Sequence, residues 1–161
     1  MIELIIRELE NSDIPAIWKI NEEGLPGTGK VSEDEIVNLL NYSELSLGAF
    51  DENELLGIVI CLLPRTEYGS LNYAWFNKNY QDFLYVDRVA VTTNSRNKKI
   101  GSLLYEKVIA HAQKLEYPVA AEVSLKPPNP DSIRFHKRHG FAEVGVLHHE
   151  KKSVTMMLRN S

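Results

Sequence analysis

The fold is decided by residues 83–115, FLYVDRVAVTTNSRNKKIGSLLYEKVIAHAQKL. The run 83–91 has two largely apolar faces, which is typical of a strand buried in the middle of a sheet. Turn-forming residues follow at 92–95, and from Ile100 to Leu115 apolar residues recur at helical spacing. The stretch therefore predicts a central strand, a polar turn and a long helix.

The turn between this strand and helix is basic. It contains Arg96, Lys98 and Lys99, and Gly101 and Ser102 stand just inside the helix. The first N–H groups of a helix have no partner within the helix, and the helix dipole adds partial positive charge, so a phosphate can bind there. Two interpretations of these residues stay open. They form either an anion site or a solvated basic turn.

Length and charge restrict the class of protein. A chain of 161 residues is suited to one domain, residues 1–161, with a single core. The net charge of −4 argues against a nucleic-acid binder, which needs a broad basic face. The sequence has no apolar run of ~18 residues, so we expect a cytoplasmic protein that does not bind membranes. Cys61, the only cysteine, lies in an apolar run and is interpreted as core packing rather than a nucleophile.

Local signals predict further strands and helices on both sides of the central stretch. The remaining strands are expected at 2–9, 45–50, 55–63, 118–123, 141–147 and 153–158, and the remaining helices after Ser12, Ser32 and Asn129. The closing strand 153–158 is expected to be exposed and able to pair with a second subunit in a homodimer. The aromatic connection 64–82 is predicted to be a lid or substrate-facing loop, with simple packing as the alternative.

The segment 24–30 imitates a nucleotide-binding loop. Gly24 and Gly29-Lys30 have the spacing of that motif, but Val31 stands where it needs Ser or Thr to hold magnesium. The preceding segment also has helical rather than strand periodicity. We therefore interpret 24–30 as a mobile loop between two helices.

Two motifs resemble the signature of the GNAT superfamily of N-acyltransferases. The pair Val89-Ala90-Val91 and Arg96-Asn97-Lys98-Lys99-Ile100-Gly101 is similar to its V-x-V strand end and R/Q-x-x-G-x-G/A turn, with Lys99 in place of the first Gly. The run Asn129-x-x-Ser132-x-x-Phe135-His136-x-x-x-Gly140-Phe141 is similar to its N-x-x-S-x-x-F-Y-x-x-x-G-F motif, with His136 in place of Tyr. Two further stretches resemble a bacterial subgroup of predicted acetyltransferases. They are Tyr85-Val86-Asp87-Arg88-Val89 and Glu122-Val123-Ser124-Leu125-Lys126-Pro127-Pro128-Asn129-Pro130.

The resemblance implies a fold and a cofactor. The fold is α/β (α+β), with a mixed, mostly antiparallel central sheet of about seven strands, splayed between strands 4 and 5 and flanked by about four helices. The cofactor is acetyl-CoA (coenzyme A), with its pantetheine arm on the fourth strand and its pyrophosphate on the following turn. The cofactor-binding residues that follow from the motifs are Val89, Ala90, Val91, Arg96, Asn97, Lys98, Lys99, Ile100, Gly101, Ser102, Asn129 and Phe135. If position 99 requires a positive φ, a Lys there costs about 1–2 kcal/mol.

Three residues are predicted to take part in catalysis. His136 stands where the family commonly has the Tyr that serves the leaving thiolate, and the alternative is an ordinary helix His. Glu122 and Asp87 lie on apolar strands, where a carboxylate is costly to bury unless it is paired, so each is a candidate for base or substrate binding, with structural pairing as the alternative. The predicted substrate-binding residues are Tyr85, Glu23 and Trp75.

The resemblance implies an N-acetyltransferase that moves an acetyl group directly to a primary amine in a ternary complex. We expect a small-molecule amine as acceptor, with a peptide or protein amine second. No metal is predicted, because His148, His149 and Glu150 are better interpreted as a polar hairpin tip. Two other classes stay open: a non-catalytic module that senses acyl-CoA, and an interaction domain that binds no acyl-CoA.

Overall fold

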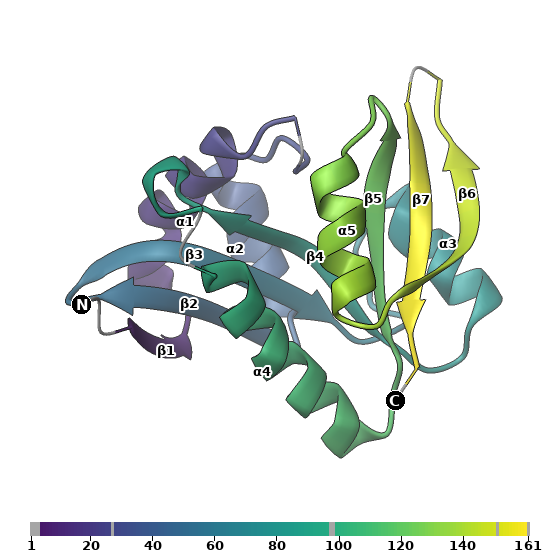
Figure 1. Ribbon diagram of the computed structural model, residues 1–161. Helices are drawn as coiled ribbons and strands as arrows, with labels where there is room; N and C mark the ends of the chain where they lie inside the picture. Colours follow the sequence, from purple (N-terminus) through teal and green to yellow (C-terminus); the bar gives the residue numbers. More distant parts are fainter. Residues whose placement is uncertain (1–3, 27, 97–98, 151, 161) are drawn as a thin grey trace. The chain divides into compact units, whose positions relative to one another are not determined.

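The computed structural model describes residues 4–26, 28–96, 99–150 and 152–160. Within them the strands are β1 (Leu4–Glu8), β2 (Leu45–Asp51), β3 (Glu54–Leu62), β4 (Leu84–Val91), β5 (Val119–Lys126), β6 (Ala142–His148) and β7 (Ser153–Arg159) (Figure 1). The helices are α1 (Ile14–Glu23), α2 (Glu33–Tyr42), α3 (Leu71–Asn79), α4 (Ile100–Leu115) and α5 (Pro130–Arg138), with short 3₁₀ turns at Asn11–Asp13 and Thr93–Ser95.

The strands form one mixed sheet in the order β1-β2-β3-β4-β5-β7-β6. β4 and β5 pair in parallel, at Leu84 with Val119 and at Tyr85 with Ala120. The pairs β1–β2, β2–β3, β5–β7 and β6–β7 are antiparallel. This confirms the predicted mixed, mostly antiparallel sheet of seven strands, whereas the splay beyond the paired residues of β4 and β5 stays a prediction.

The chain divides into two compact units. Unit 1 comprises Met1–Leu62 and Asp87–Val108, and unit 2 comprises Leu63–Val86 and Ile109–Ser161. The division falls within β4, whose first residues belong to unit 2 and whose last residues belong to unit 1. The residues of the predicted site are thus distributed over both units, and a single domain over residues 1–161 stays a prediction.

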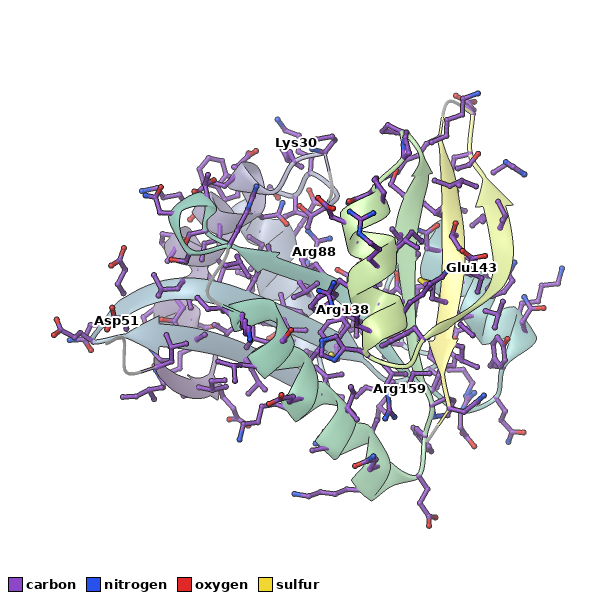
Figure 2. The ribbon with its side chains drawn as sticks, viewed as in Figure 1. Lys30, Asp51, Arg88, Arg138, Glu143 and Arg159 are labelled. Carbon is purple, nitrogen blue, oxygen red and sulfur yellow. The ribbon has the colours of Figure 1, made fainter. Side chains whose placement is uncertain are left out.

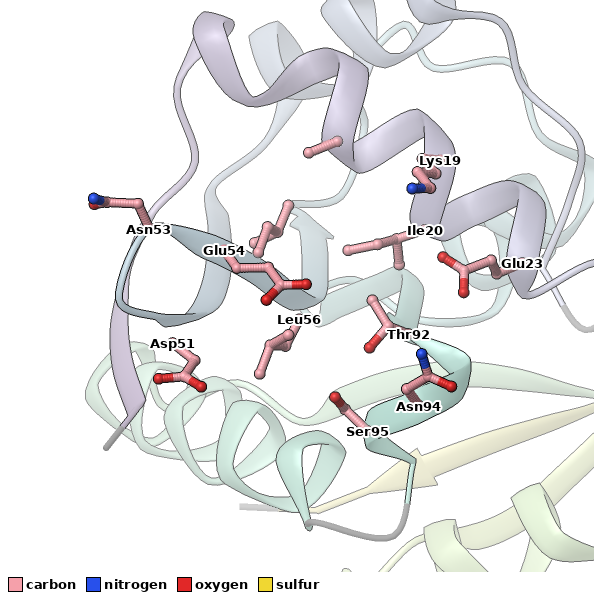
Figure 3. Close-up of a pocket in the computed structure, with 12 residues that line it drawn as sticks. Lys19, Ile20, Glu23, Asp51, Asn53, Glu54, Leu56, Thr92, Asn94 and Ser95 are labelled. Carbon is pink, nitrogen blue, oxygen red and sulfur yellow. The ribbon is translucent and has the colours of Figure 1, made fainter. Parts of the chain in front are cut away.

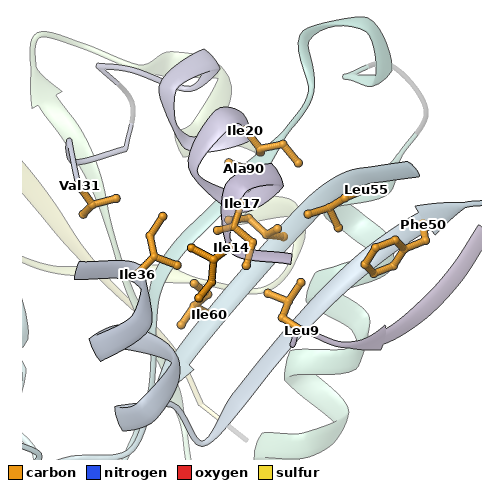
Figure 4. Close-up of a cluster of buried hydrophobic side chains, with 11 residues drawn as sticks. Leu9, Ile14, Ile17, Ile20, Val31, Ile36, Phe50, Leu55, Ile60 and Ala90 are labelled. Carbon is orange, nitrogen blue, oxygen red and sulfur yellow. The ribbon is translucent and has the colours of Figure 1, made fainter. Parts of the chain in front are cut away.

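The core of unit 1 lies between two helices and the β2–β3 hairpin. Ile17 of α1 and Ile36 of α2 pack with Ile58 and Ile60 of β3, and all four are fully buried (Figure 4). Burying such a side chain contributes about 1.5–3 kcal/mol. On the other face of β3, a Cβ on Gly57 would lie 2.8 Å from Cγ2 of Ile100, so the glycine permits the close approach of α4.

Unit 2 contains a helix where the sequence predicted a loop. Residues 71–79 form α3, which begins at the N-cap Ser70 and buries Tyr73 and Phe76. The rings of these two residues pack on Phe83 and Tyr85, at centroid distances of 5.2–6.3 Å. The prediction of a loop over residues 64–82 is therefore wrong for residues 71–79, and the described part of the chain has five α-helices. The N-cap and the i, i+3 spacing of Tyr73 and Phe76 are the signal that identifies this helix.

The closing strand is also placed differently from the prediction. β7 lies between β5 and β6, and residues 153–158 are buried. The prediction that residues 153–158 form an exposed edge for a second subunit is wrong, because both edges of β7 already have partners. The edge strand at this end of the sheet is β6, which follows α5 and the turn at Gly140 (φ 88°).

The described helices share one further property. None of them combines the length and the apolar character that a membrane crossing requires.

Candidate active site

The turn that follows β4 in unit 1 is tied to the end of α1. Arg96 donates from Nη2 to the carbonyl oxygen of Glu23 at 3.0 Å and from Nε to that of Val91 at 3.3 Å. The Glu23 carboxylate accepts a hydrogen bond from the backbone N–H of Thr93 at 3.2 Å. Glu23, a predicted substrate-binding residue, therefore has a structural role, because its hydrogen bonds hold this turn in place.

Lys99 occupies the strained position that the motif comparison suggested. Its φ is 60°, in the left-handed region that favours glycine, and it directly precedes Ile100, the first residue of α4. Its carbonyl accepts from the N–H of Leu103 at 3.1 Å, which begins the helical ladder. The backbone thus adopts a left-handed conformation at this position even without the glycine. Of the other predicted residues, Asn97 and Lys98 lie outside the described residues.

The strand and helix on either side of this turn fit a phosphate-bearing cofactor. Val89 and Val91 share one half-exposed face of β4, whereas Ala90 lies on the buried face. Ile100 is buried and anchors the helix, while Gly101 and Ser102 are partly exposed in its first turn. A helix N-terminus beside Arg96 and Lys99 supplies amide donors and positive charge, which is the chemistry that holds pyrophosphate.

Asp87 and Arg88 form a buried ion pair on β4. Arg88 (Figure 2) donates from Nε to Oδ2 of Asp87 at 2.7 Å, and the two side chains are 6% and 4% exposed. Nη1 of Arg88 also donates to Oδ1 of Asn21 at 2.8 Å and to the carbonyl of Gly29 at 3.1 Å. Asn21 donates to the same carbonyl at 2.9 Å. These contacts favour structural pairing for Asp87 and fix one end of the glycine-rich loop.

Unit 1 also contains an open pocket of about 530 Å³. Lys19, Ile20 and Glu23 of α1 line one side, and the β2–β3 turn and the turn after β4 line the others (Figure 3). Cys61 does not lie in it. The Cys61 thiol is fully buried, and burial raises its pKa far above the ordinary value. The structure therefore confirms that Cys61 is core packing.

In unit 2, Glu122 of β5 is held by two donors. Its Oε1 accepts from the hydroxyl of Tyr85 at 2.9 Å and from Nδ2 of Asn72 at 3.2 Å. Tyr85 is fully buried and Glu122 is half-buried. The structure thus brings two predicted site residues into contact and adds Asn72 of α3, which sequence reasoning missed because it lies 50 positions from its partner.

His136 lies on the buried side of α5. Its Nδ1 lies 2.8 Å from the carbonyl oxygen of Ser132, and because a carbonyl can only accept, Nδ1 carries the hydrogen. In the neutral ring Nε2 is then an acceptor. The pKa of His136 is lowered, chiefly by burial, which opposes the role of proton donor that the motif position suggests.

The remaining predicted residues of unit 2 have identifiable structural contacts. Asn129 caps α5, because its Oδ1 accepts from the N–H of Ser132 at 3.3 Å. Phe135 is half-buried, and its ring meets the His136 ring edge-on at 5.4 Å. Trp75 packs on β6, where a Cβ on Gly145 would lie only 2.6 Å from its Cζ2. None of these contacts tests the predicted roles in binding.

The sequence of the chain matches a known family over most of its length. The profile of the acetyltransferase (GNAT) family matches residues 6–141. The chain therefore belongs to the acetyltransferase (GNAT) family, and its class of enzyme is N-acetyltransferase. A search of curated protein sequences found no match.

Solved structures of acetyltransferases share the fold. Ard1 from Thermoplasma volcanium is 18% identical with a TM-score of 0.78, and the match covers 97% of this chain and 96% of that one. The ribosomal-protein-S18-alanine N-acetyltransferase from Escherichia coli is 17% identical with a TM-score of 0.75, over 98% and 93% of the two chains. Arabidopsis thaliana NAA60, solved with a bisubstrate analogue, is 18% identical with a TM-score of 0.78, over 97% of both.

Proposed function

We propose that the protein transfers the acetyl group of acetyl-CoA to a primary amine by direct transfer in a ternary complex. Membership of the acetyltransferase family supports the reaction class. A small-molecule amine is the first candidate acceptor, and a peptide N-terminus is the second. The peptide candidate is supported by fold relatives such as the ribosomal-protein-S18-alanine N-acetyltransferase.

In this proposal the donor is held by residues of unit 1. The backbone of Val89–Val91 binds the pantetheine arm, and the first turn of α4 with Arg96 and Lys99 binds the pyrophosphate. The positive φ of Lys99 supports this assignment, because the backbone adopts the required turn despite the missing glycine. When bound, acetyl-CoA supplies the thioester whose C–S bond breaks as the new C–N bond forms.

Glu122 is the proposed base, and its contacts are the observation that carries the proposal. Two donors orient its Oε1, and its strand neighbours Ala120, Ala121 and Val123 are apolar. The carboxylate takes one proton from the acceptor ammonium, which leaves a neutral amine able to attack. Asp87 is the weaker candidate because its carboxylate is engaged by Arg88 at 2.7 Å.

His136 does not protonate the leaving thiolate in this proposal. Its pKa is lowered by burial, so near neutral pH the ring is uncharged and Nε2 accepts rather than donates a hydrogen bond. As the amide forms, the attacking nitrogen loses its second proton, and water carries that proton to the released thiolate. A cytoplasmic location stays a prediction from the sequence.

Thiol release from acetyl-CoA tests this function. The assay pairs acetyl-CoA with a panel of small primary amines and with a peptide that begins with alanine. Wild-type protein is expected to release thiol in step with amine acetylation, and Glu122→Gln is expected to lose roughly 100-fold or more in kcat, the scale of general base catalysis. Absence of amine acetylation across the panel, or an unchanged kcat in Glu122→Gln, contradicts the proposal.

A further inference from the structure

The Glu122 carboxylate is the inner end of a chain of hydrogen bonds in unit 2. Asn72, in the first turn of α3, donates from Nδ2 to Oε1 of Glu122 at 3.2 Å. Oδ1 of the same amide lies 2.9 Å from Nε2 of His149. These two hydrogen bonds therefore link β5, through α3, to the turn between β6 and β7.

The chemistry of the three groups fixes the direction of each hydrogen bond. An ionised carboxylate only accepts, so the amide group of Asn72 must point its NH₂ toward Glu122. The amide oxygen then faces His149, and because this oxygen also only accepts, Nε2 of His149 must carry a hydrogen. The two hydrogen bonds can form together only in this orientation of the Asn72 amide. They also require the tautomer of His149 that carries a hydrogen on Nε2.

The helix that carries Asn72 is itself held firmly. The Tyr73 hydroxyl donates to the carbonyl of Leu63 and accepts from the N–H of Thr66 at 2.9 Å. On the opposite side the Trp75 ring packs against Gly145 of β6, at a distance that leaves no room for a Cβ. A rigid support of this kind keeps a polar contact within the tolerance that catalysis requires.

We propose that Asn72 and His149 are positioning residues that orient the Glu122 carboxylate toward the acceptor amine. Asn72 acts directly on Oε1, and His149 acts through Asn72 by fixing which way its amide faces. The inference rests on the proposed function, since it takes Glu122 to be the base. It assigns a catalytic purpose to α3 and to the β6–β7 turn, neither of which belongs to the two sequence motifs.

Kinetics of matched variants test this inference. Asn72→Ala and His149→Leu are expected to lower kcat roughly 10- to 100-fold, the scale of a misplaced catalytic group, with the KM for acetyl-CoA unchanged. His149→Gln should recover most of the loss, because the Gln amide places an N–H near the site of Nε2. The controls are His148→Leu, at the adjacent end of β6, and Asn79→Ala, on the same helix as Asn72, and both should keep wild-type kcat.

A spectroscopic measurement separates this inference from the proposed function. Long-range ¹H–¹⁵N spectra of the imidazole rings should show His149 with its hydrogen on Nε2, and the signal should move in Asn72→Ala and in Glu122→Gln but not in Asn79→Ala. If these shifts occur and kcat of Asn72→Ala stays within twofold of wild type, the contacts are merely structural and the inference is overturned. If the wild type acetylates no amine, the proposed function fails and the inference fails with it, whatever the spectra show.

Discussion

Asp87 and Arg88 are neighbours in the sequence and also bind each other, with Nε of Arg88 2.7 Å from Oδ2 of Asp87. Adjacent residues of a strand point to opposite faces, so the contact requires the long Arg side chain to fold back. Both groups are almost fully buried, and Oδ1 of Asn21 and the carbonyl oxygen of Gly29 also accept hydrogen bonds from the guanidinium. A buried pair of this kind is sensitive to the loss of either member.

Arg88→Met should therefore destabilise the protein by about 3–5 kcal/mol, because it leaves a buried carboxylate without its partner. Urea unfolding measures the free energy. The double variant Asp87→Asn, Arg88→Met removes both charges and should recover a large part of the loss. A single variant as stable as wild type would contradict the account of this pair.

Lys99→Gly should stabilise the folded protein. A left-handed residue with a side chain costs about 1–2 kcal/mol, part of which is offset by the greater freedom of glycine in the unfolded chain. We expect a net gain of up to about 1 kcal/mol, which corresponds to a rise in Tm of roughly 2–4 °C. Lys99→Ala is the matched control, since it removes the charge and keeps the Cβ. An equal gain in both variants would mean that charge, not backbone strain, is responsible.

The stability of the protein should fall at mildly acidic pH because of His136. Burial lowers the pKa of His136 in the folded state, whereas the unfolded value is about 6.5. The contribution is fully present above about pH 6.5 and is lost as the pH falls through the folded-state pKa, because the unfolded chain takes up the proton first. Denaturant midpoints measured from pH 8 to pH 5 should decline less in His136→Asn than in wild type. Identical declines of the denaturant midpoint in the two proteins would refute the assignment of this pH dependence to His136.

Gly145→Ala should lower stability by about 1–3 kcal/mol, the cost of overpacking. The new Cβ would lie 2.6 Å from Cζ2 of Trp75, so α3 and β6 would have to move apart. The double variant Gly145→Ala, Trp75→Leu should regain most of the stability, and thermal unfolding of the four proteins gives the coupling between the two sites. If the stability changes of the two single variants simply add, position 145 and Trp75 are not in steric conflict.

Local sequence signals account for much of the fold. The two apolar faces of 83–91 and the helical spacing from Ile100 correctly predicted β4 and α4. The helix expected after Ser32 is α2, where Ser32 forms a capping box with Glu35. The condition placed on Lys99, a positive φ, is also met. These features depend on residues close together in the chain, which is why a sequence pattern could predict them.

The parts that were missed depend on distant residues. The contact between Asn72 and Glu122 spans 50 positions and that between Arg88 and Asn21 spans 67, so no local pattern predicts either. α3 was missed because its buried face consists of a few aromatic residues among polar ones, and Leu71 is 70% exposed. The place of β7 depends on the strand order, which an alternating pattern does not determine.

Binding of acetyl-CoA is the most direct test of the central claim that the turn between β4 and α4 holds this acetyl donor. The Tm should be measured alone and with acetyl-CoA, coenzyme A or ATP. At ~100 times its dissociation constant, a ligand stabilises by about 2.7 kcal/mol, which raises the Tm of a domain of this size by roughly 5–10 °C. The account predicts such a rise with acetyl-CoA and coenzyme A and none with ATP. No shift with saturating acetyl-CoA would contradict it.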